Sequence, residues 1–409
     1  MRGTVMLSRK MIEKLERKEY AAVILAADIG ALGILRELGK RSISCIVIGN
    51  EFIQKSKYTT AAIQAQTKED VVNILLKIPH LLKVKLVLFT DADEYLEIIY
   101  SNWDQLINHY QIPASKNNFK LVDKEELALF AEESLIKVPK TFYKIEDINS
   151  SEYPVIVKPL IHSRMYIKSR IQTEKAYICY NKEQLIRIVD FLRKLNKPFI
   201  TQQMIEGEVN KIYEVLIYRG KDGKIKIGYV AKKLRSFPPN FGVGSAQITE
   251  YNPHLIQASV SLMELTDYIG VAEFEYKFCE KSNQYYLIEV NGRFPLQSGL
   301  LHKVNSGFIP GIFRDLVFLP DDDNSSIQID KKVVWVYLPS DIRAIRKEKK
   351  KLLPIYLKLL KTYSIQDALW SWKDPLPIFY YAKYILKRIY ERVREKSKQN
   401  NYRRLMKKA

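Results

Sequence analysis

The chain reads Tyr-Leu-Ile-Glu-Val-Asn-Gly-Arg-Phe at residues 286–294, and this stretch is the most informative part of the sequence. Polar and apolar residues alternate along it, as in a β-strand with one face against a core. Side chains at positions i and i+2 of a strand point the same way. The pattern predicts that Glu289, Asn291 and Arg293 share one face, with Leu287 in line with them. The opposite layer is expected to receive Ile288, Val290 and Phe294.

A second alternating run, Val-Ala-Glu-Phe-Glu-Tyr-Lys, precedes it at residues 271–277 and places Glu273 and Glu275 on one face. If the two runs form a hairpin, their carboxylates converge with the Asn291 amide oxygen and the Arg293 guanidinium. Oxygen ligands of this kind suit Mg²⁺, which is usually shared with substrate phosphates. The hairpin therefore indicates an ATP-using enzyme. The alternative is that the charged face is only the solvated side of a half-covered sheet.

Composition narrows the class of protein. At 409 residues, 47% of them hydrophobic and 27% charged, the chain is long enough for two or three domains. The three cysteines lie far apart and the five histidines are scattered, so neither a disulfide framework nor a zinc site is indicated. No apolar run reaches the length of about 18 residues that a membrane span needs. Residues 1–20 are expected to form a basic helical leader and not a secretory signal.

The first part of the chain has the pattern of a strand, a helix and a second strand. An apolar run at 21–27 is followed by a glycine turn, a helix-like stretch to Gly39 and an apolar run at 43–48. This order predicts a parallel sheet with helices on its faces. Gly30 and Gly33 do not complete a dinucleotide fingerprint. They either help an anion such as a substrate carboxylate to bind at the helix N-terminus, or merely permit the turn.

Further along, Lys158 lies on a Val-Lys-Pro strand, Lys175 precedes another strand, and a strand at 199–208 runs into a glycine turn. Together with the Glu-x-Asn-x-Arg strand, this order resembles the ATP-grasp superfamily. More narrowly, four short segments resemble predicted carboxylate–amine ligases (carboligases) related to D-aspartate ligase: Lys-Lys-Leu-Arg at 232–235, Pro238-Pro239 with Phe241-Gly242, Ala-Leu-Trp-Ser at 368–371, and Asp-Pro-Leu-Pro at 374–377. The resemblance extends from about Ala21 to Leu386.

The resemblance implies an α/β plus α+β architecture in which two α+β lobes hold ATP behind a parallel α/β domain. The expected divisions are a leader (1–20), a pre-ATP-grasp α/β domain (21–120), a small ATP-grasp lobe (121–200), a catalytic lobe (201–320) and a basic helical extension (321–409). The implied activity is that of an ATP-grasp ligase, which activates a carboxylate, expected to be amino-acid-like, as an acyl phosphate and joins it to an amine.

The site residues follow from the same resemblance. The nucleotide is expected to contact Lys158 and Lys175 through its phosphates, the backbone of Gln203, Met204 and Ile205 through its adenine, and either Glu206 or Glu208 through its ribose. One or two Mg²⁺ ions, with Mn²⁺ as an alternative, would be held by Glu275, Glu289 and Asn291. Arg293 would stabilise the transferring phosphoryl group. Lys233 and Arg235 are candidates for gripping the carboxylate substrate, or else belong to a solvated basic strand.

Two departures from the family pattern remain. The loop from Leu160 to Arg170, which should cover the phosphates, contains no glycine, and Gln203 occupies a position where an acid is common.

The residue types of the proposed site also make chemical sense without the resemblance to the family. A carboxylate attacks an anionic triphosphate only when cations neutralise the charge, and it needs no general base because it is already ionised near neutral pH.

The net charge of +20 is concentrated at the ends of the chain. Residues 341–409 contain 20 Lys and Arg against 6 Asp and Glu. From Ile378 the apolar spacing predicts an amphipathic helix, which either docks on the ligase body or lies on an anionic membrane. We expect docking to about Leu386 and a basic tail beyond it that contacts a membrane or polyanion. A specific nucleic-acid partner is not indicated, because no recognised module accompanies the charge.

The sequence therefore predicts a cytoplasmic ligase that uses ATP and Mg²⁺, with a peripheral location at the inner face of the membrane as a further option. Its partners would be a small carboxylate and an amine acceptor on a peptide, glycan or envelope precursor. The alternative is a non-catalytic ATP-binding scaffold of the same fold, recruited to a membrane or polyanion by the basic tail. The substrates and the oligomeric state are not determined by these motifs.

Overall fold

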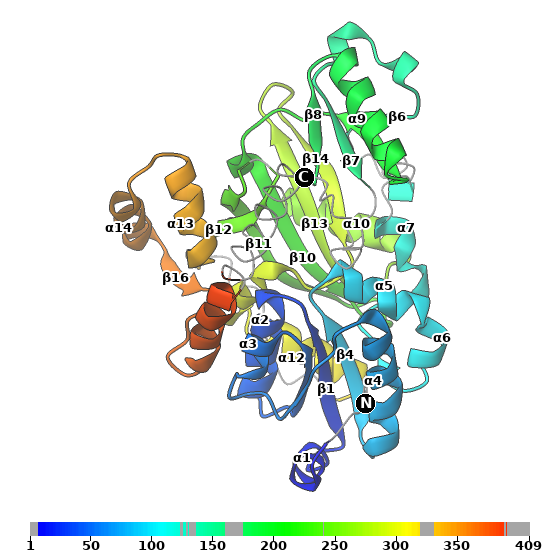
Figure 1. Cartoon of the computed structure of the whole chain (residues 1–409), viewed down its shortest axis with the longest axis vertical. Coiled ribbons are helices and arrows are strands. Elements are labelled where there is room, and N and C mark those ends of the chain that lie inside the picture. The colour runs from blue at the N-terminus through cyan, green and yellow to red at the C-terminus, as the bar shows by residue number, and fades with distance from the viewer. Residues whose placement is uncertain are drawn as a thin grey trace, which may run out of the picture.

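The computed structural model describes residues 7–122, 126–127, 130, 136–159, 175–239, 241–319, 331–387 and 390. Three β-sheets organise these residues: a five-stranded sheet at the bottom of Figure 1, a seven-stranded sheet in the middle and a four-stranded sheet at the top. The expected loop at 160–170 and the tail beyond 390 lie outside the described residues.

The five-stranded sheet is parallel, in the order β3-β2-β1-β4-β5. Its strands are β1 (Tyr20–Ala26), β2 (Cys45–Gly49), β3 (Ala61–Ile63), β4 (Lys85–Thr90) and β5 (Tyr110–Gln111). The accompanying helices are α1 (Arg9–Leu15), α2 (Ile29–Lys40), α3 (Glu51–Gln54), α4 (Lys68–Leu81), α5 (Asp93–Ser101) and α6 (Trp103–Leu106). Because helices cover both faces, β1 is buried along nearly its whole length, as its continuous apolar run predicts.

The four-stranded sheet forms the small lobe, with the order β6-β9-β7-β8. Its strands are β6 (Thr141–Phe142), β7 (Val155–Pro159), β8 (Tyr177–Cys179) and β9 (Phe199–Gln203), and two short turns of 3₁₀ helix, η2 (Ile145–Asp147) and η3 (Ser150–Glu152), lie between β6 and β7. Helix α9 (Lys182–Lys194) begins where the Asn181 side chain accepts a hydrogen bond from the backbone N–H of Gln184. Its buried Leu185, Val189 and Leu192 pack against the sheet.

The seven-stranded sheet has the order β14-β13-β10-β11-β12-β15-β16. Its strands are β10 (Ile212–Arg219), β11 (Ile225–Phe237), β12 (Val243–Thr249), β13 (Gly270–Cys279), β14 (Gln284–Asn291), β15 (Val333–Val336) and β16 (Ser364–Asp367). Associated elements are η1 (Lys116–Asn118), α7 (Phe119–Val122), η4 (Val209–Lys211), α10 (Pro253–Leu265), η5 (Leu296–Leu300), α11 (Leu301–Val304), α12 (Phe308–Leu316), α13 (Leu338–Lys347) and α14 (Leu352–Thr362).

The segment from 321 onward differs from the helical extension that the sequence suggested. It contributes α13, α14 and a helix over 376–387, but also β15 and β16, which extend the large sheet. The run Val333–Val336 is fully buried, and its continuous apolar character is that of a covered strand. The basic helices are therefore attached to the sheet that carries the hairpin.

The expected hairpin is formed by β13 and β14, with one irregularity. Glu275 pairs with Glu289 and Tyr276 pairs with Leu287, so that β14 has one extra residue, Ile288, between its paired positions. A bulge of this kind reverses the facing of the residues beyond it. Leu287, which the simple alternation placed on the face of Glu289, consequently joins Val290 in the hydrophobic core.

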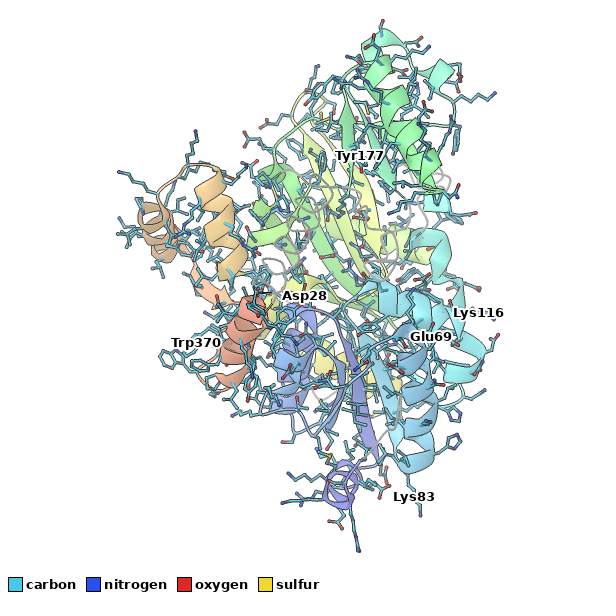
Figure 2. All side chains as sticks on the ribbon, in the orientation of Figure 1. Asp28, Glu69, Lys83, Lys116, Tyr177 and Trp370 are labelled. Atoms are coloured by element: carbon cyan, nitrogen blue, oxygen red, sulfur yellow. The ribbon has the colours of Figure 1, made fainter. Side chains whose placement is uncertain are left out.

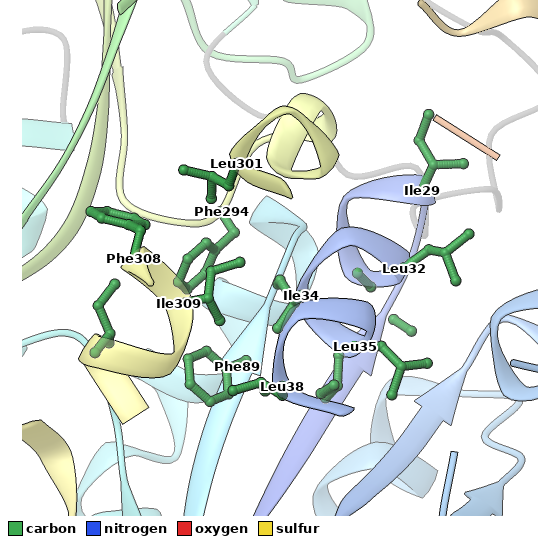
Figure 3. Close-up of a cluster of buried hydrophobic side chains, with 14 of the residues drawn as sticks. Ile29, Leu32, Ile34, Leu35, Leu38, Phe89, Phe294, Leu301, Phe308 and Ile309 are labelled. Atoms are coloured by element: carbon green, nitrogen blue, oxygen red, sulfur yellow. The ribbon is translucent and has the colours of Figure 1, made fainter. Parts of the chain in front are cut away.

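One hydrophobic core joins the five-stranded sheet to the large lobe (Figure 3). Apolar residues of α2, among them Leu35 and Leu38, face Phe89 of β4 and, from the large lobe, Phe294 and Phe308. A Cβ atom on Gly33 would lie 2.6 Å from the backbone nitrogen of Gly299. Glycine at position 33 therefore permits η5 to approach α2 closely.

A buried ion pair fastens the C-terminal segment to the N-terminal domain. The Arg36 guanidinium on α2 donates to the Asp374 carboxylate at 2.9 Å, although 338 residues separate the two positions. The same carboxylate accepts hydrogen bonds from the Ser56 hydroxyl and the Lys57 backbone N–H. Just beyond, Tyr381 packs edge-on against Phe52, as expected for a helix that docks through its apolar face.

No helix within the described ranges combines the length and the apolar character that crossing a bilayer would require.

Candidate functional site

The charged face of the hairpin is assembled by its register. Glu275 lies opposite Glu289, and Glu273 lies opposite Asn291, on adjacent antiparallel strands. Directly opposed residues on neighbouring strands share a face of the sheet. Four side chains with oxygen ligands are therefore gathered on one face, and both Glu273 and Glu275 are buried.

Lys233 occupies the middle of this acidic face. It extends from β11, and its ammonium group lies 2.9 Å from a carboxylate oxygen of Glu214 on β10 and 2.9 Å from one of Glu275. Burial opposes the charge on Lys233, but the two carboxylates outweigh it and raise the pKa of Lys233 above the ordinary lysine value. The lysine is 6% exposed, so that it is a buried component of the site and not part of a solvated strand.

Two further residues of the cluster were not assigned from the sequence. Glu214 and Gln297 are both buried, and the Gln297 amide nitrogen donates to Glu214 and to Glu273. The Tyr229 hydroxyl also donates to Glu273, at 3.2 Å. Burial, reinforced by the Glu214 carboxylate, raises the pKa of Glu273 well above its usual range. The sequence signal that could have found Glu214 is that it is a charged residue inside the apolar run of β10.

The small lobe contributes Lys175 to the same region, whereas the hydrogen bond from Lys158 to Gln202 stays within the small lobe. Lys175 lies 3.5 Å from a carboxylate oxygen of Glu289, so that an ammonium group of one lobe faces a carboxylate of the other. The Glu289 charge raises the pKa of Lys175. Lys158, on β7, donates to the side-chain oxygen of Gln202 at 3.0 Å.

The segment after β9 connects the small lobe to the large one. The Gln203 backbone N–H donates to the Lys140 carbonyl next to β6, so this amide belongs to the sheet of the small lobe. Met204 and Ile205 follow without regular structure, and Ile205 is buried. Glu206 and Glu208 are exposed: Glu206 lies 3.4 Å from the Lys281 ammonium, and Glu208 accepts from the Asn210 amide.

Arg293 connects the hairpin to the N-terminal domain. Its Nε and one Nη atom donate to the two carboxylate oxygens of Asp93, at 2.9 and 3.2 Å. Its Nη2 atom also lies 3.5 Å from the Asn291 side-chain oxygen. Burial opposes the charge, but Asp93 raises the pKa of Arg293. Asp93, at the start of α5, is thus a positioning residue for Arg293.

Arg235 is held in a different network from the one its candidate role requires. Its Nε and Nη2 atoms each donate at 2.8 Å to the carboxylate of Asp341, which is completely buried. The Ser245 and Tyr356 hydroxyls donate to the same carboxylate. Because the Arg235 guanidinium already donates to both oxygens of Asp341, it links β11 to α13 and does not offer these donors to a substrate.

The N-terminus of α2 already holds a carboxyl group of the protein itself. The Asp91 carboxylate accepts hydrogen bonds from the backbone N–H groups of Ala27, Asp28 and Ala31, at 2.8 to 3.0 Å. A Cβ atom on Gly30 would lie 2.6 Å from the Pro295 carbonyl oxygen and 3.2 Å from an Asp91 carboxylate oxygen. The two glycines of this turn therefore serve close packing, and the Asp91 carboxyl group occupies the position where an external anion would bind.

The donor set of the hairpin fits a divalent cation. Glu275, Glu289 and Asn291 offer oxygen atoms, which are the ligands that Mg²⁺ prefers. The ammonium groups of Lys233 and Lys175 lie against the two carboxylates and show that this face attracts cations. Among the described residues, no three acidic, histidine or cysteine side chains gather closely enough to hold a metal by themselves. Substrate phosphates would have to complete the coordination.

Comparisons with known proteins bear on the fold and on the class of enzyme. No protein-family model matches the chain. A D-aspartate ligase of Enterococcus faecium (strain Aus0004) is 21% identical over 361 residues, which cover 81% of this chain and 86% of that protein. An L-amino acid ligase structure from Bacillus licheniformis superimposes with a TM-score of 0.57 at 14% identity, covering 78% of this chain and 79% of that one. The chain has the ATP-grasp fold.

A further solved structure is the biotin carboxylase domain of the Hydrogenobacter thermophilus 2-oxoglutarate carboxylase, in complex with MgADP and bicarbonate. It superimposes on this ATP-grasp chain with a TM-score of 0.59 at 13% identity, covering 77% of this chain and 73% of that one. The expected fold is thereby confirmed, the ligase class agrees with the D-aspartate ligase, and ATP with Mg²⁺ agrees with the bound MgADP of the solved relative. The individual roles of the site residues stay predictions.

Proposed function

We propose that this ATP-grasp protein is a carboxylate–amine ligase that activates an amino-acid-like carboxylate with ATP and joins it to an amine. The observation that carries the proposal is the face on which Glu275 and Glu289 lie directly opposite each other, with Asn291 beside them and ammonium groups against both carboxylates. Glu275, Glu289 and Asn291 would hold a Mg²⁺ ion there, which would supply positive charge against the charge that develops during phosphoryl transfer.

The protein's own residues account for the remaining requirements. Lys158 and Lys175 in the small lobe would meet the phosphates as compact point charges. Arg293, fixed by Asp93, would lie against the transferring phosphoryl group. Met204 and Ile205 would receive the adenine between the lobes, with the ribose near Glu206 or Glu208.

The reaction has two steps. A carboxylate oxygen attacks the γ-phosphorus, the bond to the β-phosphate oxygen breaks, and an acyl phosphate and ADP form. The amine nitrogen then attacks the acyl carbon, phosphate leaves, and the nitrogen loses a proton to give the amide. The buried cations of the site lower the barrier of the first step, because they offset the repulsion between two anions.

A residue other than Arg235 must bind the carboxylate of the substrate, because the Arg235 guanidinium is already paired with Asp341. Arg343 is the better candidate. It follows β15 on α13, and its guanidinium lies 4.9 Å from the centre of the Phe237 ring at the end of β11. Its hydrogen bonds go to the Pro339 carbonyl and the Ser340 hydroxyl, so that, unlike Arg235, it has no carboxylate partner in the described part of the chain.

Release of ADP and phosphate across a panel of amino acids and amine acceptors, with mass spectrometry of the products, tests the proposal. Glu289→Gln should lower turnover at least a hundredfold, whereas Glu264→Gln, an exposed change on α10 of the same lobe, should leave it intact. Binding of ATP by the wild-type protein without turnover of any substrate pair would instead favour the non-catalytic scaffold. Equal turnover by both variants would contradict the site.

A further inference from the structure

The exposed apolar side chains of this protein are unevenly distributed. Nine of the eighteen large apolar residues that are exposed in the described part of the chain lie between Leu352 and Tyr390. Single exposed apolar residues are normal on soluble proteins, whereas adjacent ones mark a surface that contacts something else. The concentration points to α14 and the helix over 376–387, on the left flank of the molecule in Figure 1.

Helix α14 carries an apolar row on its outer side. Leu353, Leu357 and Leu360 are 69%, 51% and 59% exposed, and their spacing of four and then three residues places them on one face. The inward side of the helix is already satisfied by Leu359, which is buried in a small cluster beneath it. The outer row is therefore additional to what packing of α14 requires.

The helix over 376–387 repeats the arrangement. Leu376, Phe379 and Leu386 are all at least half exposed and share a face, while Tyr381 on the other side is buried against Phe52. Trp372, just before the helix, is 85% exposed and stands edge-on to Trp370, which Figure 2 labels at the margin of the same flank. Indole rings in such positions are typical of an interface between water and lipid.

The charge of this segment is positive and points outward. From Lys347 to Lys387 there are nine lysines and three acidic residues. Two of the acids face inward: Asp374 is 1% exposed and bound by Arg36, and Asp367 accepts the backbone N–H groups of Leu369 and Trp370. Lysines alternating with exposed leucines and aromatics therefore define the surface.

We propose that α14 and the helix over 376–387, with Trp372, form a docking surface for an anionic lipid bilayer. The leucines and aromatic rings would enter the boundary between headgroups and acyl chains, and the lysines would meet lipid phosphates, each contributing about 1 kcal/mol. A second copy of the chain is the less suitable partner, because two such surfaces would bring lysines against lysines.

The proposal goes beyond the ligase activity, since it assigns a location to the enzyme and not a step in catalysis. The surface is joined to the active-site lobe through β16, the edge strand of the same seven-stranded sheet that carries β13 and β14. Docking would therefore fix the orientation of the ATP site relative to a membrane and favour an amine acceptor that is held there.

Flotation of the full chain with vesicles tests the surface. Wild type should float with vesicles containing phosphatidylglycerol and stay behind with pure phosphatidylcholine. A triple variant, Leu353→Ser with Leu357→Ser and Leu360→Ser, should lose at least tenfold in binding, and Lys358→Glu with Lys361→Glu should do the same. The matched control replaces three exposed apolar residues elsewhere, Tyr143, Tyr180 and Leu265, by serine and should float like wild type.

Several results would overturn the proposal. The first is flotation of the leucine variant that equals that of wild type, and the second is equal binding of wild type to both kinds of vesicle. The third is that neither protein floats and that wild type is a dimer whereas the leucine variant is a monomer. A chain ending at Tyr390 separates the surface from the basic tail: it should keep part of its binding, and complete loss would show that the tail alone holds the membrane. ATP turnover of every variant verifies that the ligase body is folded.

Discussion

The ammonium group of Lys233 lies 2.9 Å from a carboxylate oxygen of Glu275, the residue that we assign to metal binding. The same ammonium group reaches Glu214 at an equal distance. A buried cation thus neutralises the acidic face from within the sheet, and it reduces the charge that a bound metal ion meets. Removing it should change the stability of the protein and its response to Mg²⁺ together.

Lys233→Met should lower the free energy of unfolding by about 3–5 kcal/mol, because it leaves buried carboxylates without their partner. Mg²⁺ should restore more stability to this variant than to wild type, since the ion can then bind a more negative face. Urea unfolding with and without Mg²⁺ measures both effects. Equal stabilisation of the two proteins by Mg²⁺ would show that Lys233 and the metal do not share the site.

Arg293→Lys should reduce ADP release about 10²–10³-fold with little loss of stability, because a lysine cannot reproduce a fork that is oriented by two hydrogen bonds. Asp93→Asn should have a smaller effect, on kcat more than on KM, since it loosens Arg293 without removing it. The matched control is Arg219→Lys, which alters a pair with the exposed Asp267. Steady-state kinetics that place the whole effect in KM would argue against a role in the transition state.

Arg235→Met should destabilise the protein by about 3–5 kcal/mol, because the completely buried Asp341 loses its partner. Combining it with Asp341→Leu should recover most of the stability, since both charges are then absent. Chemical unfolding of the single and double variants measures this coupling. If the recovered double variant still shows a strongly raised KM for the carboxylate, Arg235 contacts substrate after all.

Stability should also depend on Asp91. Burial raises its pKa from 3.8 to about 7, in spite of the backbone N–H groups that favour its charged form. Between these values the folded state holds a proton that the unfolded state has released, so the free energy of unfolding falls as pH rises from about 4 to 7. Asp91→Asn removes this titration and shifts stability by an offset that does not depend on pH.

Urea unfolding of wild type and Asp91→Asn at pH 5, 6, 7 and 8 tests the sign. The stability of wild type relative to the variant should decrease up to about pH 7 and then level off. Asp104→Asn, an exposed substitution, should follow wild type at every pH. A relative stability that stays constant from pH 5 to pH 8 would mean that the amides at the N-terminus of α2 keep Asp91 ionised.

The elements with strong local patterns could be predicted from the sequence. The alternation around Glu289 was sufficient for the hairpin and its charged face, and the apolar runs at 21–27 and 43–48 were sufficient for the parallel sheet. The ATP-grasp architecture was predicted from the resemblance that the order of these motifs shows to that superfamily. Such patterns can be recognised in the sequence because each one lies entirely within a single strand or turn.

What could not be predicted depends on contacts between distant segments. The commitment of Arg235 to Asp341 and the placement of Asp93 against Arg293 join residues 106 and 200 positions apart, and nothing local marks either pair. Leu287 was placed on the wrong face because the bulge at Ile288 is a property of the pairing between strands. The strands β15 and β16 were missed because basic helices dominate the composition around them.

The ion pair between Arg36 and Asp374 has a consequence for how the protein is made. The guanidinium belongs to α2 of the N-terminal domain, but its carboxylate partner is translated 338 residues later. At roughly 5–20 residues per second, the ribosome delivers that partner about 17 to 70 s after Arg36. Until then Arg36 has no Asp374 carboxylate to pair with, so the contact that fastens the two segments forms only after Asp374 has been synthesised.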